Sequence, residues 1–160
     1  MPHRSGALVF EPLGDFSCAR FVAWRLLTRL FQYSNPYSPM RAVVNAGLCY
    51  DCEALFDDAS LSLRLSFAFR RFTELDVLLE CLLGVLRSKS WIEQSIAGAQ
   101  AGMLLNLRMQ PLMYRAASII PYRLLNPECT WGMLMGEIAR VTAESAIEEL
   151  YGAGFEAEFV

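Results

Sequence analysis

Apolar positions recur at helical spacing along most of the chain. The first such segment, residues 15–31, begins at Asp15 or Ser17, either of which can cap a helix, and Asn35-Pro36 predicts its end. Four apolar residues within it share the spacing i, i+4, i+7 and i+11, which places them on one helix face: Ala19, Ala23, Leu26 and Leu30. The pattern predicts an amphipathic helix.

Two further helices are predicted from their end signals. Ser38 as N-cap and Pro39 at the first helical position begin a helix over residues 38–56, which Gly47 weakens in its middle. Near the C-terminus, residues 127–151 form the segment with the clearest end signals. Asn126 is the predicted N-cap, Pro127 takes the first helical position and Glu128 lies in the first turn. Gly152 is the predicted C-cap.

Residues 75–88 are apolar on nearly every side of a helix, which predicts a buried central helix. The apolar positions are Leu75, Val77, Leu78, Leu79, Leu82, Leu83, Val85 and Leu86, and we expect Leu82 and Leu83 to be fully buried. The apolar stretch at 101–116 is expected to pack against this helix, forming a helical hairpin joined near residues 88–93. Pro111 should kink or split the second arm, and Pro121 should end it.

Strict alternation in "SLSLRLSFAFRRF" is the pattern of a strand. Its large positions are Leu61, Leu63, Leu65, Phe67 and Phe69. No second segment of similar quality is evident, and a lone strand cannot satisfy its backbone groups. The segment is therefore interpreted as helix. The prediction is an all-α bundle in one domain, residues 1–160, with flexible ends at 1–12 and 152–160.

Composition excludes some classes of function. Hydrophobic residues make up 54% and charged residues 19% of the chain, which excludes a disordered chain and favours a large core or an apolar binding surface. The net charge of -3, without a basic run, does not favour nucleic-acid binding. The longest apolar run, 77–86, contains Glu80 and is too short to span a membrane. A soluble, intracellular chain without an anchor is expected.

Residues that could support catalysis are sparse. The only histidine is His3, and the five cysteines include the pair Cys49 and Cys52 in a C-x-x-C spacing. A structural zinc site needs four ligands, so these cysteines are interpreted as ordinary reduced residues. We expect no metal, no cofactor and no enzymatic activity.

Four motifs in order resemble one family. They are "LGDFSCAR", "DCEALFDDASL", "LRSKSWIEQ" and "GMLLNLRMQPLMYRA". Together they are similar to the small antigen of adenovirus early region 1B, a family of viral Bcl-2-like apoptosis inhibitors, over about residues 12–120. The resemblance implies a Bcl-2-like bundle around a central hydrophobic hairpin.

The same resemblance implies a function. The chain would bind the BH3 helices of pro-apoptotic partners, namely Bak, Bax and BH3-only proteins, in a hydrophobic groove and so block mitochondrial apoptosis. It would act in the host cell cytoplasm, with peripheral association at the nuclear envelope or mitochondrial surface, and without a transmembrane anchor.

A groove for such a helix needs an apolar trough with charges at its rim. The candidate trough residues are Phe67, Phe69, Phe72, Val77, Leu78, Cys81 and Leu82, with Arg70 and Arg71 at the rim. The family's usual Gly-Arg pair is missing, because Glu74 and Leu75 stand about where it would be. Arg70 or Arg71 is predicted to replace that arginine. The alternative is that these residues are plain core.

Two other functions remain open. One is an all-α adaptor that recruits a host partner through its C-terminal helix, residues 127–151, without a groove. The other is a small zinc-supported module that uses Cys49 and Cys52. Metal analysis would separate the second from the rest.

Overall fold

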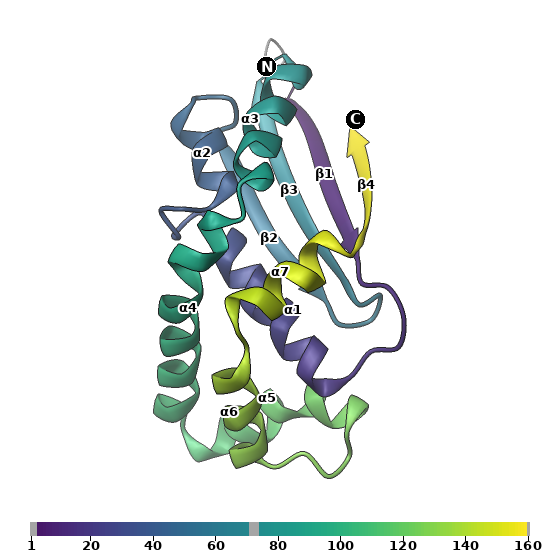
Figure 1. Ribbon diagram of the computed structural model, residues 1–160, viewed down its shortest axis with the longest axis vertical. Helices are drawn as coiled ribbons and strands as arrows, with labels where there is room; N and C mark the ends of the chain where they lie inside the picture. The colour runs from purple at the N-terminus through teal and green to yellow at the C-terminus, as the bar shows by residue number, and fades with distance from the viewer. Residues whose placement is uncertain (1–2, 71–73, 160) are drawn as a thin grey trace.

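The computed structural model describes residues 3–70 and 74–159, in which seven helices pack against a sheet of four strands (Figure 1). In chain order the elements are β1 (His3–Glu11), α1 (Cys18–Phe31), α2 (Pro39–Asn45), β2 (Asp51–Asp57), β3 (Ser62–Arg70), α3 (Leu75–Arg87), α4 (Ser90–Met109), α5 (Leu112–Leu125), α6 (Trp131–Arg140), α7 (Ala143–Tyr151) and β4 (Gly154–Phe159). The fold is mixed α/β, and the prediction of an all-α Bcl-2-like bundle is wrong.

The sheet is antiparallel throughout, in the order β2-β3-β1-β4. The segment 60–72 was interpreted as helix from the sequence, but Ser62–Arg70 within it form β3 in the interior of this sheet. Alternate residues of β3 point to the same buried face: Leu63, Leu65, Phe67 and Phe69. The alternation was therefore a true strand signal. The missing partners are β2 and β1, which satisfy the backbone of β3 on both sides.

Both chain ends contribute strands. β1 pairs with β3 along its length, and β4 pairs with β1 in a register that sets Gly6 opposite Phe159. Residues 1–12 and 152–160 were expected to be flexible, yet His3–Glu11 and Gly154–Phe159 lie in the sheet. These two strands come from opposite ends of the chain, so no short-range pattern in the sequence indicates that they meet.

The starts of the first two predicted helices are confirmed. The Ser17 hydroxyl accepts the amide of Arg20 at 3.2 Å, and Ser38 caps α2 with Pro39 at its start, which confirms both caps. The second predicted helix nevertheless ends at Asn45 instead of residue 56. Gly47 follows with φ of +72°, a left-handed conformation that glycine adopts without strain, and the chain then enters β2.

The C-terminal segment is divided. Residues 127–151 were predicted as one helix, but α6 begins at Trp131, capped by Thr130, and α7 begins after Thr142 with a capping box. Gly152 does form the C-cap of α7. Pro111 splits the preceding segment into α4 and α5 as predicted, whereas Pro121 lies inside α5 and does not end it.

The central helix is α1. Nine of its residues are buried, including Trp24 and Phe31, and it packs against β2, β3 and four other helices. α3, predicted to be central, buries only Leu78, Leu82 and Leu86 and packs against α2. Its continuation α4 runs on from it without folding back (Figure 1), and packs against α1, α6 and α7. The predicted α3–α4 hairpin is therefore wrong.

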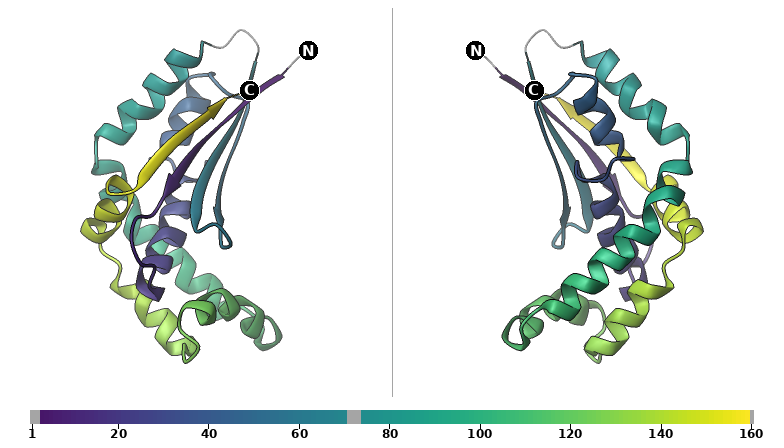
Figure 2. Two further views of the ribbon diagram at one scale, coloured as in Figure 1. Left: turned by 90° about the vertical axis from the view of Figure 1, so that its right-hand side faces the viewer. Right: turned by 90° about the vertical axis from the view of Figure 1, so that its left-hand side faces the viewer.

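The helices cover one face of the sheet. Figure 2 shows the strands on one side and the helices on the other, with α4, α5 and α6 extending beyond the sheet. The opposite sheet face carries exposed side chains that include Ser5, Glu53, Leu55 and Arg64. In the part of the chain that the structure describes, no helix has both the length and the apolar character that a membrane crossing needs.

Candidate functional site

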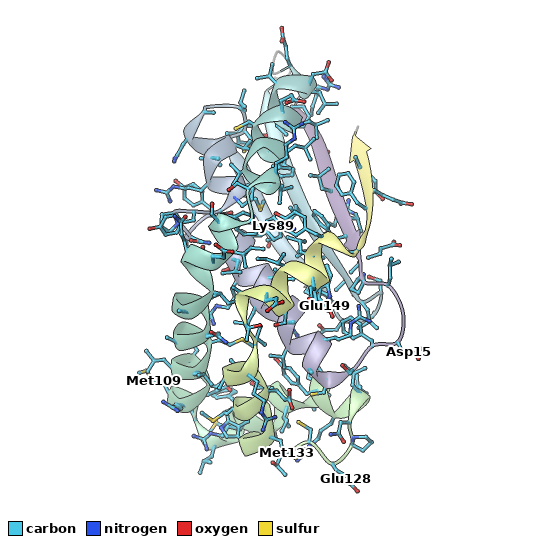
Figure 3. The ribbon with its side chains drawn as sticks, viewed as in Figure 1. Asp15, Lys89, Met109, Glu128, Met133 and Glu149 are labelled. Carbon is cyan, nitrogen blue, oxygen red and sulfur yellow. The ribbon has the colours of Figure 1, made fainter. Side chains whose placement is uncertain are left out.

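A polar cluster joins α1 to α7. The Glu149 carboxylate accepts two hydrogen bonds from the Arg20 guanidinium, at 2.7 Å from Nε and 2.9 Å from the second nitrogen, and a third from Trp24 Nε1 at 2.9 Å. Arg20 and Trp24 are four positions apart, so they lie on one face of α1 and both face α7. We call Arg20, Trp24 and Glu149 the Glu149 cluster; Figure 3 labels Glu149 at its centre.

The polar groups of the Glu149 cluster hydrogen-bond within the protein and are largely shielded from solvent. Arg20 also donates to the backbone carbonyl of Asp15 at 2.8 Å, and its side chain is 25% exposed, against 17% for Glu149. The hydrogen bond to Glu149 raises the pKa of Arg20 above its ordinary value, which keeps the guanidinium charged. Such a bidentate pair is suited to holding two helices together.

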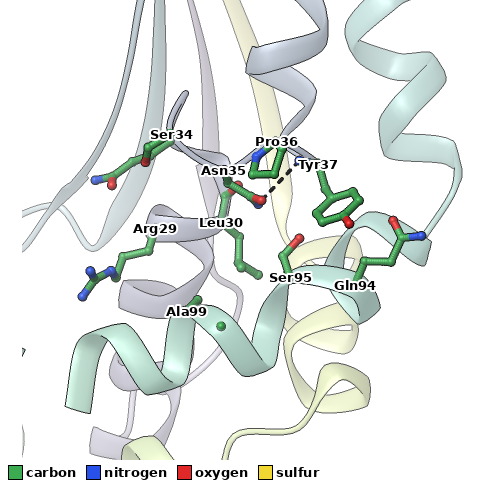
Figure 4. Close-up of a pocket in the computed structure, with 11 residues that line it drawn as sticks. Arg29, Leu30, Ser34, Asn35, Pro36, Tyr37, Gln94, Ser95 and Ala99 are labelled. Atoms are coloured by element: carbon green, nitrogen blue, oxygen red, sulfur yellow. Dashed lines mark hydrogen bonds between the residues drawn. The ribbon is translucent and has the colours of Figure 1, made fainter. Parts of the chain in front are cut away.

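Two hollows lie near these helices. One of about 250 Å³ borders the Glu149 cluster and is lined partly by charged side chains, among them Glu137, Arg140 and Glu148. A second, of about 330 Å³, lies between the end of α1 and α4 (Figure 4). Its polar groups serve local structure: the Asn35 amide donates to Leu30 O at 2.8 Å and accepts from Tyr37 N at 3.2 Å.

The cysteines form two neighbouring pairs of free thiols. Cys49 and Cys52 are hydrogen-bonded to each other, which raises the pKa of Cys49 and lowers that of Cys52. Burial, together with the neighbouring Cys129, raises the pKa of Cys18 to about 11. Among residues 3–70 and 74–159, no group of three or more His, Cys, Asp or Glu side chains could hold a metal ion.

An apolar surface lies at the end of α4 and along α5. Six large side chains on it are each more than half exposed: Leu105 (55%), Met109 (74%), Leu112 (79%), Met113 (77%), Ile120 (56%) and Leu124 (78%). We call these six residues the α4–α5 apolar surface. The stretch 101–116, expected from the sequence to pack against residues 75–88, thus exposes much of its apolar surface to solvent.

The structure does not bring the predicted groove residues into an open trough. Phe67 and Phe69 are buried in β3, and Leu78 and Leu82 are buried in α3. Val77 is 45% exposed and Cys81 half-buried on the same helix. The rim candidate Arg70 ends β3, whereas Arg71 and Phe72 lie outside the described residues.

Comparisons with known proteins connect the chain to a peptidase fold. The chain matches no protein-family model and no curated protein sequence. An inactive peptidase domain assigned to a zinc protease of Bordetella parapertussis is similar over 99% of this chain and 92% of its own, with a TM-score of 0.74 at 11% identity.

Longer proteins contain the same fold as a part. A protein of Alicyclobacillus acidocaldarius assigned as an M16-like peptidase matches 99% of this chain but only 40% of its own length, with a TM-score of 0.68 at 14% identity. A chain of Complex III2 from Candida albicans matches with a TM-score of 0.65 at 12% identity, over 100% of this chain and 43% of its own. The fold is M16-peptidase-like.

This fold overturns the adenovirus resemblance. This chain shares its fold with solved peptidase-like proteins, and it contains a four-stranded sheet that a Bcl-2-like bundle lacks. The anti-apoptotic function, the viral early-protein assignment and the partners Bak, Bax and BH3-only proteins are therefore withdrawn. The four motifs that suggested them are spread over helices, strands and turns of another fold.

The alternative adaptor, working through a C-terminal helix, has no specific support either. Residues 127–151 form α6 and α7, whose Leu134, Ile138, Ala146 and Leu150 are buried in the core. The Glu149 cluster could not be predicted from the sequence, because Glu149 lies 125 positions from Trp24 and 129 from Arg20. The i, i+4 spacing of the apolar stripe on α5 is a property of the sequence. The sequence does not tell whether that stripe faces the core or solvent.

Proposed function

We propose that this chain is a peptidase-fold domain that does not hydrolyse peptides and instead binds other proteins. The similarity to an inactive peptidase domain supports the first part of this proposal. Zinc peptidases of the inverted type carry H-x-x-E-H, with two histidines as metal ligands and a glutamate between them. This chain contains one histidine in all, so it cannot supply that motif.

The observation that carries the proposal is the Glu149 cluster. On α1, Arg20, Ala23 and Trp24 have the same i, i+3, i+4 spacing as the three motif residues, and Arg20 and Trp24 both donate to Glu149. A guanidinium and an indole N–H are donors only, so neither can ligate zinc, and Ala23 has no carboxylate to act as a base. The residues on this face of α1 do not fit a zinc ion, and they join two helices through an ion pair instead.

Binding is supported by the exposed apolar residues and by how the fold is used elsewhere. Exposed apolar patches of this kind mark interaction sites on soluble proteins. The matching chain of Complex III2 shows the fold inside a multi-protein assembly. In the longer matching proteins the fold accounts for 43% of the chain or less, so it works there beside other protein parts.

A peptidase assay tests the catalytic half of the proposal. Purified chain is incubated with added zinc, denatured casein and a mixture of internally quenched peptides. We expect no cleavage above the protein-free blank and no stoichiometric zinc binding by calorimetry. The matched control is Glu149→Gln, which removes a carboxylate from the cluster. Zinc-dependent cleavage by the purified chain would overturn the proposal, and loss of that cleavage in Glu149→Gln would locate it at the cluster.

We infer that the chain works in a reducing compartment. The number of cysteines is odd, five in this chain, which favours reduced thiols over a set of structural disulfides. Trapping the protein from its native cells with acid and an alkylating reagent should show five modified thiols. A trapped disulfide would contradict this inference.

A further inference from the structure

α5 turns its apolar stripe outward. Leu112, Ala116, Ile120 and Leu124 follow one another at i, i+4 along its exposed side. The inward side is held by Ile119 and Tyr122, which are 3% and 5% exposed. An amphipathic helix in a globular protein normally faces its apolar stripe toward the core. The apolar stripe of α5 therefore faces solvent, where a partner could contact it.

The stripe continues onto α4. Met109 and Leu112 lie on either side of the turn at Gln110-Pro111, and Leu105 precedes Met109 by one helical turn. Figure 3 shows Met109 pointing away from the molecule, and Figure 2 shows α5 at the end of the molecule distant from the sheet. The α4–α5 apolar surface therefore lies at the end of the molecule distant from the sheet (Figure 2).

The charged residues of the segment that carries this surface have one sign. From residue 94 to residue 127 the chain contains no Asp, Glu or Lys, and three arginines: Arg108, Arg115 and Arg123. The remainder of the chain therefore carries -6, since the whole chain carries -3 and this segment +3. A partner with carboxylates beside its apolar contact would be complementary.

The arginines favour a protein over a lipid surface. Arg115 donates to Gln110 O at 3.3 Å and lies 5.2 Å from the Trp131 ring, and Arg123 donates to Cys129 O at 3.1 Å. Guanidinium groups held in this way present fixed donors to a partner carboxylate. Met, Tyr and Arg are also enriched in protein interfaces, where Lys, Glu and Asp are depleted.

An isologous dimer through the α4–α5 apolar surface is disfavoured by the same charges. An isologous contact would bring the three arginines of each copy together without a carboxylate from either surface. Backbone hydrogen bonding further restricts the secondary structure of the partner segment. α5 satisfies its own backbone groups within the helix, so it cannot pair with a strand, and the partner segment must satisfy its own groups in turn. A helix does so.

We propose that the α4–α5 apolar surface docks an amphipathic helix of a partner protein, with an apolar stripe flanked by carboxylates. This proposal rests on the proposed function, because it names the partner class of a domain that binds rather than cleaves. Ridges at i, i+4 on α5 would pack between the side chains of the incoming helix.

The test uses the full chain and three fluorescent helical peptides of about twenty residues, long enough to span α5. The first has a leucine stripe flanked by glutamates, the second has lysines in place of the glutamates, and the third has the same composition as the first with its leucines redistributed around the helix. We expect the first to bind at least about tenfold more tightly than the second, and the third not to bind.

Variants locate the site. Leu112→Ser and Leu124→Ser should each weaken binding of the glutamate peptide at least about fivefold without lowering the melting temperature, because both side chains are almost fully exposed. The matched controls are Leu13→Ser and Leu55→Ser, at leucines 62% and 56% exposed elsewhere on the molecule. These controls should bind as the parent does.

Other outcomes overturn the proposal. These are absence of binding, equal binding of all three peptides, binding unaffected by Leu112→Ser and Leu124→Ser, binding to phosphatidylglycerol vesicles in place of the peptides, or a dimer that Leu112→Ser dissociates. The peptides are also analysed for cleavage. Cleaved peptide would contradict the proposed function itself, whereas peptide that is neither bound nor cleaved contradicts only the docking proposal.

Discussion

Leu82 is one residue whose environment the sequence indicated correctly. It was predicted to be fully buried, and its side chain in α3 has no exposed surface, whereas its neighbour Leu83, predicted to be equally buried, is only partly so. The difference arises because α3 covers the core from one side and does not lie at its centre. A helix with one buried face keeps only every third or fourth residue inside.

Replacing Leu82 with Ala should therefore lower the free energy of unfolding by about 2–5 kcal/mol, because the surrounding core cannot fully close over the cavity. Urea unfolding followed by circular dichroism measures the change. Val77→Ala on the same helix is the control, since Val77 is 45% exposed and should alter stability by less than about 0.5 kcal/mol. Equal effects of the two substitutions would mean that α3 is not packed as described.

Glu149 should contribute to stability through its three hydrogen bonds. Glu149→Gln keeps the size of the side chain but removes the charge that meets Arg20, so we expect a loss of about 1–2 kcal/mol in the free energy of unfolding, moderated by partial exposure to solvent. The control is the adjacent exposed Glu148→Gln, which should be nearly neutral. If both variants unfold at the same denaturant concentration, the cluster does not hold α7 to α1.

Tyr122 should make stability depend on alkaline pH. Burial raises the pKa of Tyr122 to about 12, above the ordinary tyrosine pKa of about 10, so the folded state retains a proton that the unfolded state loses first. Its contribution is complete below about pH 10 and declines as the pH rises toward 12, by about 2–3 kcal/mol in all. Comparing the free energy of unfolding of the parent and Tyr122→Phe between pH 9 and 12 isolates the contribution of Tyr122 ionisation. Parallel pH profiles for the two proteins would contradict it.

Among the elements, β4 has the clearest structural role that the sequence concealed. It covers the outer edge of β1, and its Phe155 ring lies 5.3 Å from the Phe10 ring. The acidic tail that contains it has the composition of a solvated end. Pairing with β1 supplies the hydrogen bonds that order it.

A chain ending at Ala153 retains the cap of α7 but loses β4. It should melt at a lower temperature and aggregate faster than the full chain, because the edge of β1 becomes available for pairing between molecules. Circular dichroism during heating measures the melting temperature, and light scattering measures aggregation. Phe155→Ala is the control: it keeps the backbone of β4 and should lower the melting temperature without promoting aggregation. Unchanged behaviour of the truncated chain would show that β4 is dispensable.

At the scale of the molecule, the sheet joins the two ends of the chain, so the fold depends on both. Removing residues 126–160 deletes β4 together with Leu134, Ile138 and Leu150, which are buried against the rest of the core. We expect the truncated chain 1–125 to lack cooperative unfolding and resistance to proteolysis. Adding the missing segment in trans is the control, and should restore some protection. A truncated chain that folds by itself would mean that the C-terminal third is a separate unit.

Local chemistry explains what the sequence determined. Ser17, Ser38 with Pro39, and Gly152 act on groups within four residues of themselves, so the start of α1 and α2 and the end of α7 could be predicted. The same holds for Pro111, which removes a donor that a continuous helix would need. Alternation at Leu63, Leu65, Phe67 and Phe69 also indicated a strand. The segment was interpreted as helix because no partner strand was evident in the sequence.

Tertiary structure decided the rest. Backbone hydrogen bonds between strands depend on partners far apart in the chain: Phe10 is paired with Leu63 on one side and with Phe155 on the other. The Glu149 cluster depends on α1 meeting α7 over a similar separation. Finally, the apolar stripe of α5 has the same periodicity whether it faces a core or a partner. Only the position of α1 and α6, which hold Ile119 and Tyr122 inward, leaves Leu112 and Leu124 exposed.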